Sequence, residues 1–279
     1  MTLVEHRLRI GDRAVTLLEG PAGWGEISPL PGYPCDPERA RLAAEEAACV
    51  GWPLARRSAI PVNALVADAV DPDALAGFGT VKVKVGRDRP SADIDRLAAV
   101  RDAVGPHVRV RVDANGAWDV ATAVDRIARL ARFDLELVEQ PVATLDDLAR
   151  VRRRVAVPVA ADESVRSLVD ARRARRLHAA DVLVLKVQPL GGVAAALAVA
   201  DAAGIPALVT SMMETSIGLA AGAALAAALP DLPYACGLAT AGVVGGDVVR
   251  DPLVAHDGML AVRRPVPDPA LMARYGVSR

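Results

Sequence analysis

From residue 58 onward the chain alternates short aliphatic segments with amphipathic ones, and this alternation restricts the fold more than any other feature. The aliphatic segments have the length of strands and lie at 61–66, 80–85, 108–113, 135–139, 157–162, 181–186, 205–210 and 234–238. Helical segments separate them, and Ser91 is the predicted N-cap of one. Strands that alternate with helices favour a parallel α/β fold, and eight of them is the number that closes a (β/α) barrel of the TIM type. An open doubly wound sheet is the alternative, but the GxGxxG sequence typical of that fold is absent.

The composition agrees with a fold of buried parallel strands. Hydrophobic residues make up 52% of the chain and aromatic residues only 3%, so the core consists of Ala, Val and Leu. The most apolar helical stretch, 217–229, is too short to span a bilayer, and we predict a packed internal helix there.

The first 57 residues have a different pattern. They contain two polar-alternating segments, a Gly/Pro-rich stretch, GWGEISPLPGYP, which predicts a loop, and one helix. We predict a small α+β capping domain at 1–57 that docks on a barrel domain at 58–240. The tail, 241–279, lacks the barrel rhythm and is predicted to complete the cap.

Charge and cysteine content restrict partners and location. The net charge is −1 and no basic patch is evident, which argues against nucleic acid as a partner. The three cysteines form no CxxC pair, and the N-terminus lacks the apolar segment of a signal peptide. We therefore expect a cytoplasmic protein with no membrane association, and no obligate protein partner is evident.

Charged residues stand at the ends of five consecutive predicted strands. They are Lys82 and Lys84, then Asp113, Glu139, Asp162 and Lys186, each about one strand–helix unit after the last. In barrel enzymes the catalytic groups lie at the C-terminal ends of the strands, so all of these side chains are expected to meet at one mouth.

The residue types at this mouth suggest a chemistry. Three carboxylates without His or Cys form a hard oxygen site that suits Mg²⁺, with Mn²⁺ able to replace it. Lys84 and Lys186 flank it on two sides. A lysine near a second cation, here Lys82, can act as a base near neutral pH because its charged form is disfavoured.

Each of these residues also has a simpler interpretation. The VKVKV lysines are compatible with the wet face of an edge strand, and an Asp or Glu after a strand is often only a helix N-cap. Asn115 either supports the metal or substrate or forms a turn. Ser211, after the seventh strand, is placed to meet the polar end of a substrate.

The order of motifs resembles that of the enolase superfamily, in its muconate lactonizing enzyme-like branch. The motifs are KxK (82–84), DAN (113–115), EQP (139–141), DES (162–164) and a lysine before a Gly-Gly turn. Within this branch, GWGEISPLPG at 23–32 is similar to the cap sequence of the o-succinylbenzoate synthases of menaquinone biosynthesis. The resemblance covers essentially the whole chain and implies a modified, enolase-like barrel with an α+β cap.

The resemblance also implies roles for the residues. Asp113, Glu139 and Asp162 would bind Mg²⁺, Lys84 would remove the proton α to the substrate carboxylate, and Lys186 would stabilise the intermediate. The implied reaction is dehydration of 2-succinyl-6-hydroxy-2,4-cyclohexadiene-1-carboxylate to 2-succinylbenzoate. From their positions we predict Lys82, Asn115 and Ser211 as substrate-binding residues, although Met212 and Met213 follow Ser211 where the family commonly has serine-rich sequence.

Other activities of the same branch remain open. N-succinylamino acid racemases and muconate cycloisomerases would use the same metal and lysines. Dipeptide epimerases generally have DxD near the eighth strand. This chain has CGLATAG (236–242) there, which argues against that activity. A barrel that only binds ligands is disfavoured, because buried charges without a use are costly.

Overall fold

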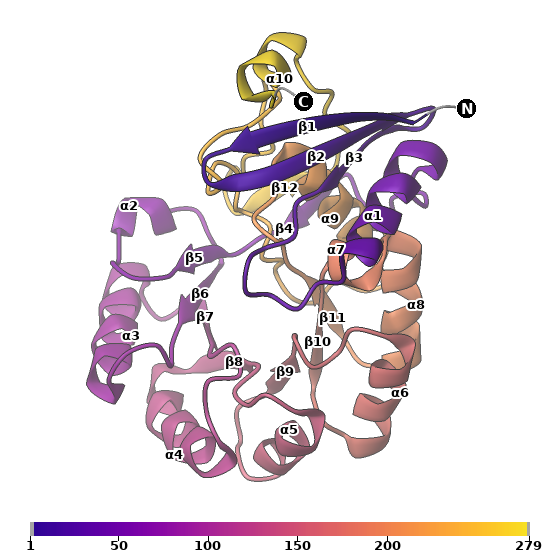
Figure 1. Ribbon diagram of the computed structural model, residues 1–279. Coiled ribbons are helices and arrows are strands. Elements are labelled where there is room, and N and C mark those ends of the chain that lie inside the picture. The colour runs from indigo at the N-terminus through magenta and orange to yellow at the C-terminus, as the bar shows by residue number, and fades with distance from the viewer. Residues whose placement is uncertain (1–2, 278–279) are drawn as a thin grey trace.

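A curled sheet of seven parallel strands forms the body of the computed structural model, which describes residues 3–277 (Figure 1). The strands follow the sheet in chain order: β5 (Ala64–Val66), β6 (Thr80–Lys84), β7 (Arg109–Asp113), β8 (Leu135–Glu139), β9 (Val159–Ala161), β10 (Val182–Leu185) and β11 (Ala207–Val209). All neighbours in this sheet pair in parallel. Because the strands are parallel, their C-terminal ends share one face of the barrel.

Residues 234–238, predicted as the eighth strand and here called the closing segment, occupy the eighth position of the barrel. Cys236 pairs with Val62 and Gly237 pairs with Thr210, each through an isolated parallel bridge. Backbone N–H groups of Cys236 and Gly237 donate 2.8 Å hydrogen bonds to the two sides. The segment therefore joins the β5 and β11 ends of the sheet. The predicted α/β barrel is confirmed, but its eighth strand pairs through only one residue on each side.

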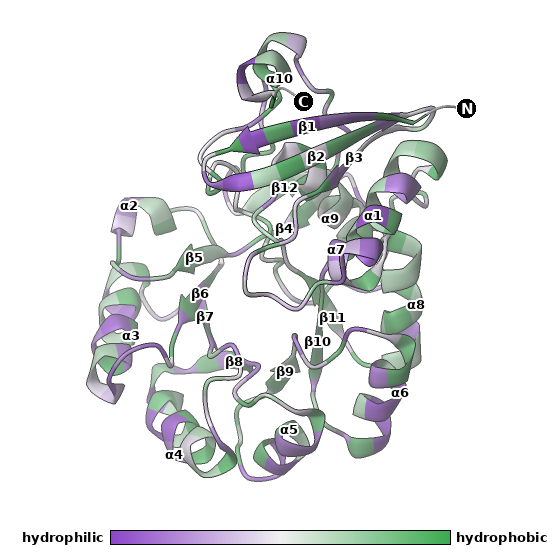
Figure 2. Cartoon of the chain, viewed as in Figure 1, coloured by the Kyte–Doolittle hydropathy of each residue, from purple (hydrophilic) through white to green (hydrophobic). Residues whose placement is uncertain are grey.

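Helices cover the outer wall of the barrel. They are α2 (Pro72–Leu75), α3 (Pro90–Val104), α4 (Val120–Leu130) with a 3₁₀ turn at Ala131–Phe133, α5 (Leu145–Arg152), α6 (Leu168–Leu177), α7 (Val187–Leu190), α8 (Val193–Ala203) and α9 (Ser216–Ala228). Figure 2 shows hydrophobic residues on the strands and hydrophilic patches on the outer helices such as α4 and α6. Helix α9 is buried along almost its whole length, which confirms the predicted internal helix. No helix within residues 3–277 combines the length and the hydropathy needed to cross a bilayer.

Helix α3 begins one residue earlier than its predicted cap. Pro90 is its first residue, and Ser91 lies inside the helix, while no side chain caps the N-terminus. Proline already has a helical φ and has no N–H to satisfy at this position, so it starts a helix without a capping side chain. The prediction of Ser91 as N-cap is therefore wrong.

A buried ion pair links strands β7 and β8 inside the barrel. Arg111 on β7 is fully buried and donates from Nη2 to Glu136 Oε2 on β8 (2.5 Å). Its Nη1 donates to the carbonyl of Ala235 (2.9 Å), which ties this pair to the closing segment. The guanidinium thus keeps its partners although it has lost all contact with water.

Three antiparallel strands and a helix form the cap (Figure 1). They are β1 (Val4–Ile10), β2 (Arg13–Gly20), β3 (Gly23–Ile27) and α1 (Pro37–Glu45), followed by a π-helical turn at Glu46–Val50. The stretch 23–32 was predicted to be a loop, but its first half is strand β3. Gly25 in this strand lets the sheet approach α1 closely, because a Cβ at this position would collide with the backbone of Ala44.

The last part of the chain returns to the cap. Strand β12 (Met259–Ala261) pairs with β4 (Ala59–Pro61), and α10 (Pro269–Tyr275) lies against β1. Both chain ends share one apolar cluster, formed by Leu8, Ile10, Val15, Leu17, Ile217, Val244, Val248 and Val249. This packing supports a cap built from both ends of the chain, and the division at residues 57 and 240 stays a proposal.

Two carboxylates of the cap bind the N-termini of barrel helices. Glu46 accepts hydrogen bonds from the backbone N–H groups of Val193 (2.5 Å) and Ala194 (2.9 Å), which begin α8. A carboxylate there satisfies free N–H groups and is favoured by the helix dipole. The amides beside the Gly-Gly turn thus hold a carboxylate of the chain itself.

Glu26 on β3 makes the equivalent contact with α9. Its Oε1 accepts from the Thr215 N–H (3.2 Å), and its Oε2 accepts from the Gly218 N–H (2.9 Å). Burial raises the pKa of Glu26 to about 7, although hydrogen bonds from Ser28 and Thr215 oppose the rise and nearby Glu214 adds to it.

This raised pKa predicts a pH dependence of stability. Folded Glu26 holds its proton to a higher pH than the unfolded chain, so its stabilising contribution is complete below pH 4.5 and is lost as the pH rises through about 7. The loss corresponds to about 3 kcal/mol for a shift of this size. Urea unfolding of the wild type and Glu26→Gln over this range should show the difference between their unfolding free energies falling by that amount. A difference independent of pH would contradict the assignment.

Candidate active site

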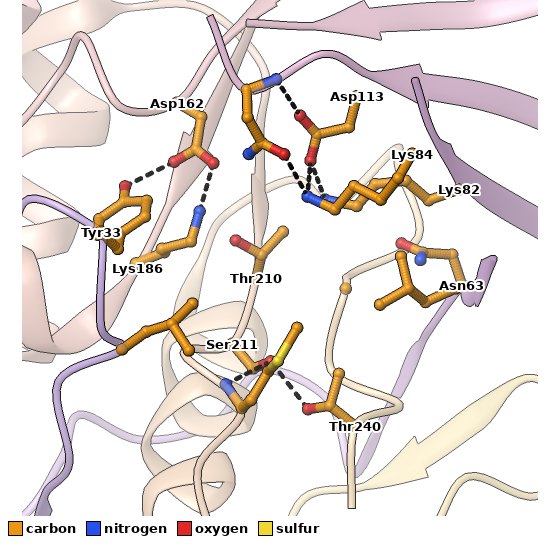
Figure 3. Close-up of a pocket in the computed structure, with 15 residues that line it drawn as sticks. Tyr33, Asn63, Lys82, Lys84, Asp113, Asp162, Lys186, Thr210, Ser211 and Thr240 are labelled. Atoms are coloured by element: carbon orange, nitrogen blue, oxygen red, sulfur yellow. Dashed lines mark hydrogen bonds and ion pairs between the residues drawn. The ribbon is translucent and has the colours of Figure 1, made fainter. Parts of the chain in front are cut away.

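A pocket opens at the face where the barrel strands end, beneath the cap (Figure 3). Its walls come from the cap, from the strand ends and from the loops after β11 and the closing segment. The residues that line it are Leu30, Tyr33, Asn63, Leu65, Lys82, Lys84, Asp113, Asn115, Asp162, Lys186, Thr210, Ser211, Met213, Gly237 and Thr240. Seven of the eight residues predicted for the site are among them, and the eighth, Glu139, forms an ion pair with the pocket residue Lys82.

The register of the strands explains why these residues meet. Lys84, the last residue of β6, pairs with Asp113, the last of β7, and Asp113 pairs with Glu139, the last of β8. Asp162 and Lys186 are the first residues after β9 and β10. Consecutive parallel strands therefore deliver one charged side chain each to the same level of the barrel.

The carboxylates and lysines form buried ion pairs. Lys82 Nζ lies 2.9 Å from Asp113 Oδ2 and 3.0 Å from Glu139 Oε1, and Lys84 Nζ lies 2.6 Å from the same Asp113 oxygen. Lys186 Nζ forms an ion pair with Asp162 Oδ2. Figure 3 shows Lys84 and Lys186 reaching into the pocket from opposite walls.

These contacts set the protonation of the groups. Burial opposes the charge of Asp113, but Lys82 and Lys84 hold its pKa well below the usual range. Burial also acts to lower the pKa of Lys82, but Asp113, Glu139 and Asp162 raise it above its ordinary value. Glu139 has its pKa raised to about 7 by burial and by the negative charge of Asp113. The site therefore keeps Lys82 as a fixed buried cation.

Lysine occurs nowhere else in the chain. The sequence contains three lysines, and all three line this pocket, while the remaining residues of the Lys+Arg total of 33 are arginines. Their side chains are 10%, 12% and 8% exposed for Lys82, Lys84 and Lys186. An ammonium group can release its proton, whereas a guanidinium stays protonated in proteins. Every lysine of the chain therefore lies at this pocket, and side chains of a type that can exchange a proton are present there.

The donor set fits a hard divalent cation. Glu139 Oε2 is buried and has no hydrogen-bond partner among the described residues, so one carboxylate oxygen is free to bind a ligand. Within residues 3–277, however, no three His, Cys, Asp or Glu side chains lie together as a metal-binding group. Lysine ammonium groups hold the carboxylate oxygens instead, and a cation would compete with them for these oxygens. On the chemistry of the donors, the residues suit Mg²⁺.

Asn115 contacts a catalytic candidate directly. It has a left-handed backbone (φ 46°), its Oδ1 accepts from Lys84 Nζ (2.9 Å), and its Nδ2 donates to Glu163 (2.9 Å). Asn115 therefore forms a turn, which was one of its two interpretations, and it also contacts Lys84. Its support of the metal or the substrate stays a proposal. Ser211 Oγ accepts a hydrogen bond from Thr240 (2.8 Å) at the other end of the pocket.

Sequence reasoning missed several residues of the pocket. Tyr33, from the cap, donates to Asp162 Oδ1 (2.8 Å), and its ring centroid lies 4.7 Å from Lys186 Nζ. Asn63 and Thr210 present buried oxygen atoms that have no partner among the described residues. A polar residue inside the aliphatic strand PVNALV was a signal for Asn63, while Tyr33 had none beyond its place beside GWGEISPLPG.

Comparisons with known proteins agree with this geometry. The family described as enolase C-terminal domain-like matches residues 64–268. The chain is 56% identical over 257 residues to an o-succinylbenzoate synthase of Thermobifida fusca, covering 89% of this chain and 81% of that protein. It is 47% identical over 277 residues to an o-succinylbenzoate synthase of Mycobacterium tuberculosis, covering 96% and 84%.

Solved structures resemble the fold over the whole chain. A muconate lactonizing enzyme from Klebsiella pneumoniae matches with a TM-score of 0.85, 22% identity and 99% coverage of both chains. A dipeptide epimerase from Enterococcus faecalis matches with a TM-score of 0.78, 24% identity and coverage of 100% and 98%. At these identities the likeness concerns the fold.

Proposed function

Because this chain belongs to the enolase superfamily, and within it to the family of the o-succinylbenzoate synthases, we propose that it dehydrates 2-succinyl-6-hydroxy-2,4-cyclohexadiene-1-carboxylate to 2-succinylbenzoate. The observation that carries the proposal is the 56% identity to a synthase together with a pocket that contains all three lysines. The reaction would serve menaquinone biosynthesis.

Lys84 is the proposed base. Its Nζ lies between Asp113 Oδ2 and Asn115 Oδ1, at 2.6 Å and 2.9 Å, and these contacts would aim it at the proton α to the substrate carboxylate. The proton passes from this carbon to Lys84 Nζ, and the electron pair moves into the carboxylate to form an enediolate. The bond from the ring to the hydroxyl group then breaks, and Lys84 returns the proton so that water leaves and the ring becomes aromatic.

Lys186 is the proposed electrostatic partner. It approaches from the wall opposite Lys84, where Asp162 and the ring of Tyr33 restrain its ammonium group. A cation that is already in place before the reaction stabilises the enediolate dianion without having to reorganise during the step. Such preorganised electrostatic stabilisation is usually the largest contribution to the rate.

The proposed Mg²⁺ ligands are Asp113, Glu139 and Asp162. An ion held by these residues would supply positive charge that stabilises the enediolate. Lys82, buried between Asp113 and Glu139, forms ion pairs with both carboxylates and would hold them in place. Asn115 and Ser211 are proposed to contact the substrate at the two ends of the pocket, with Lys82 close to the first.

The proposed setting is the cytoplasm, with a small carboxylate as the ligand. Cys35, Cys49 and Cys236 are unpaired thiols in the structure, as is usual in a reducing compartment.

Racemisation of N-succinylamino acids is a second candidate, because lysines stand on both sides of the pocket (Figure 3). Dehydration on one face needs only Lys84 as a proton carrier, whereas racemisation needs a carrier on each face. Lys186→Ala should lower the dehydration rate by about 10²- to 10³-fold, the usual effect of removing one electrostatic group. Lys186→Arg should keep a larger fraction of it, but any racemisation should vanish in both variants.

The experiment measures both reactions in wild type and both variants. Absence of cyclohexadiene turnover in the wild type would refute the proposed function. Retention of racemisation in Lys186→Arg would show that Lys186 is not a proton carrier.

A further inference from the structure

The loop at 210–215, here called the pocket loop, is held in place by the cap. It contributes Thr210, Ser211 and Met213 to the pocket. Met213 has φ 57°, a left-handed conformation that is unfavourable for a residue with a long side chain. Such a conformation persists only where the surrounding contacts enforce it.

Arg13, on the cap strand β2, supplies one set of these contacts. It is 7% exposed, and its Nη1 donates to the carbonyls of Met212 (2.8 Å) and Met213 (2.7 Å). Its Nη2 donates to the carbonyl of Ser28. One guanidinium therefore fixes the strained residue of the pocket loop to the sequence that follows β3.

Glu26 supplies the second set. Each of its oxygens accepts one backbone N–H, from Thr215 or Gly218, and one hydroxyl at 2.5 Å, from Thr215 or Ser28. The pocket loop therefore ends on a carboxylate of the cap. Within the pocket loop, Glu214 accepts a hydrogen bond from the Met212 N–H (2.7 Å), which further stabilises the loop conformation.

We infer that Arg13 and Glu26 are positioning residues that act through the pocket loop on the end of the substrate remote from the carboxylate site. Figure 3 places Ser211 and Thr240 at the opposite end of the pocket from Asp113 and Lys84. This inference rests on the proposed function for the identity of the substrate. It predicts that Arg13 and Glu26 affect how tightly and how selectively the substrate binds, and not the rate of proton transfer.

Glu26→Gln is a sharp test, because neither orientation of the amide fits. Both oxygens of Glu26 accept a backbone N–H, so the NH₂ group of a glutamine always faces an N–H donor. A protonated glutamate avoids this conflict, since its single hydrogen can turn to a neighbouring hydroxyl.

Glu46→Gln is the matched control. Glu46 is also a cap carboxylate whose two oxygens each accept a backbone N–H, but at α8 and not at the pocket loop. A variant that merely loosens the cap should behave the same at either position. Ser28→Ala, which removes one hydroxyl from Glu26, is a milder variant in case Glu26→Gln does not fold.

The variants are compared by steady-state kinetics. We expect Glu26→Gln to raise KM for the cyclohexadiene about tenfold or more while kcat changes less than threefold, the pattern of lost substrate binding. Ser28→Ala should move KM in the same direction by less, and Glu46→Gln should leave it near the wild-type value. Equal KM changes in the Glu26 and Glu46 variants, or no change in either, would overturn the inference.

Hydrogen exchange measured by mass spectrometry separates this inference from the proposed function, because it needs no substrate. Peptides covering 210–218 should exchange faster in Glu26→Gln than in wild type and in Glu46→Gln. An inactive wild type would refute the proposed function and leave this outcome interpretable. Unchanged exchange at 210–218 in Glu26→Gln would refute the inference that Glu26 positions the pocket loop, even in an active enzyme.

Discussion

Lys84→Ala is expected to lower dehydration by about 10⁴-fold or more, because one side chain is proposed to act as both base and acid. Both steps are proposed to use the same Nζ, so loss of this side chain removes the base and the acid together. Lys84→Arg should not restore the rate, since a guanidinium cannot accept the proton. It keeps a cation next to Asp113, so its folding should be less affected than that of the alanine variant.

The measurement is product formation together with exchange of solvent deuterium at the substrate α-carbon. Both signals should disappear in both Lys84 variants, while circular dichroism reports an intact fold. Dehydration near the wild-type rate in Lys84→Ala would mean that the base is a different group. The two lysines of β6 would then have only the structural role of pairing with Asp113 and Glu139.

Removal of the metal is expected to abolish activity as completely as loss of Lys84. Treatment with EDTA should stop turnover, and Mg²⁺ or Mn²⁺ should restore it, because the proposed ion at Asp113, Glu139 and Asp162 would supply positive charge that stabilises the enediolate. Full activity in a rigorously metal-free preparation would contradict the site.

Thermal unfolding gives a readout that does not depend on activity. Mg²⁺ at a hundred times its dissociation constant should stabilise the stripped protein by about 2.7 kcal/mol. Glu139→Gln should remove this effect. Glu136→Gln is the matched control, because Glu136 lies on the same strand but binds Arg111 lower in the barrel, and it should retain the metal-induced shift. Equal shifts in both variants would exclude Glu139 as a ligand.

The positions of the charged strand ends followed from the sequence because parallel strands impose them. Once strands of similar length alternate with helices, the last residue of each strand has no other place than the barrel mouth. Asp113 and Glu139 are Cα partners in the sheet for this reason. The cap contributions could not be inferred in this way. Tyr33 and Asp162 are 129 residues apart, and their contact depends on how the cap docks.

Local signals misled where packing decided the conformation. The Gly and Pro content of GWGEISPLPG predicts a loop, but Gly25 is needed inside a strand, where α1 approaches too closely for a side chain. The strand expected at 234–238 pairs through only one residue on each side, because its role is to close the barrel rather than to extend the sheet.

The confinement of lysine to the pocket gives this protein an unusual chemical selectivity. Reagents that acylate primary amines have only the chain's α-amino group and three nearly buried side chains to modify, so labelling of Lys82, Lys84 or Lys186 would report on the site alone. A protease specific for lysine has its three cleavage positions at the same place. Intact native protein should therefore resist such a protease, and the rate of cutting would measure how often the barrel mouth opens.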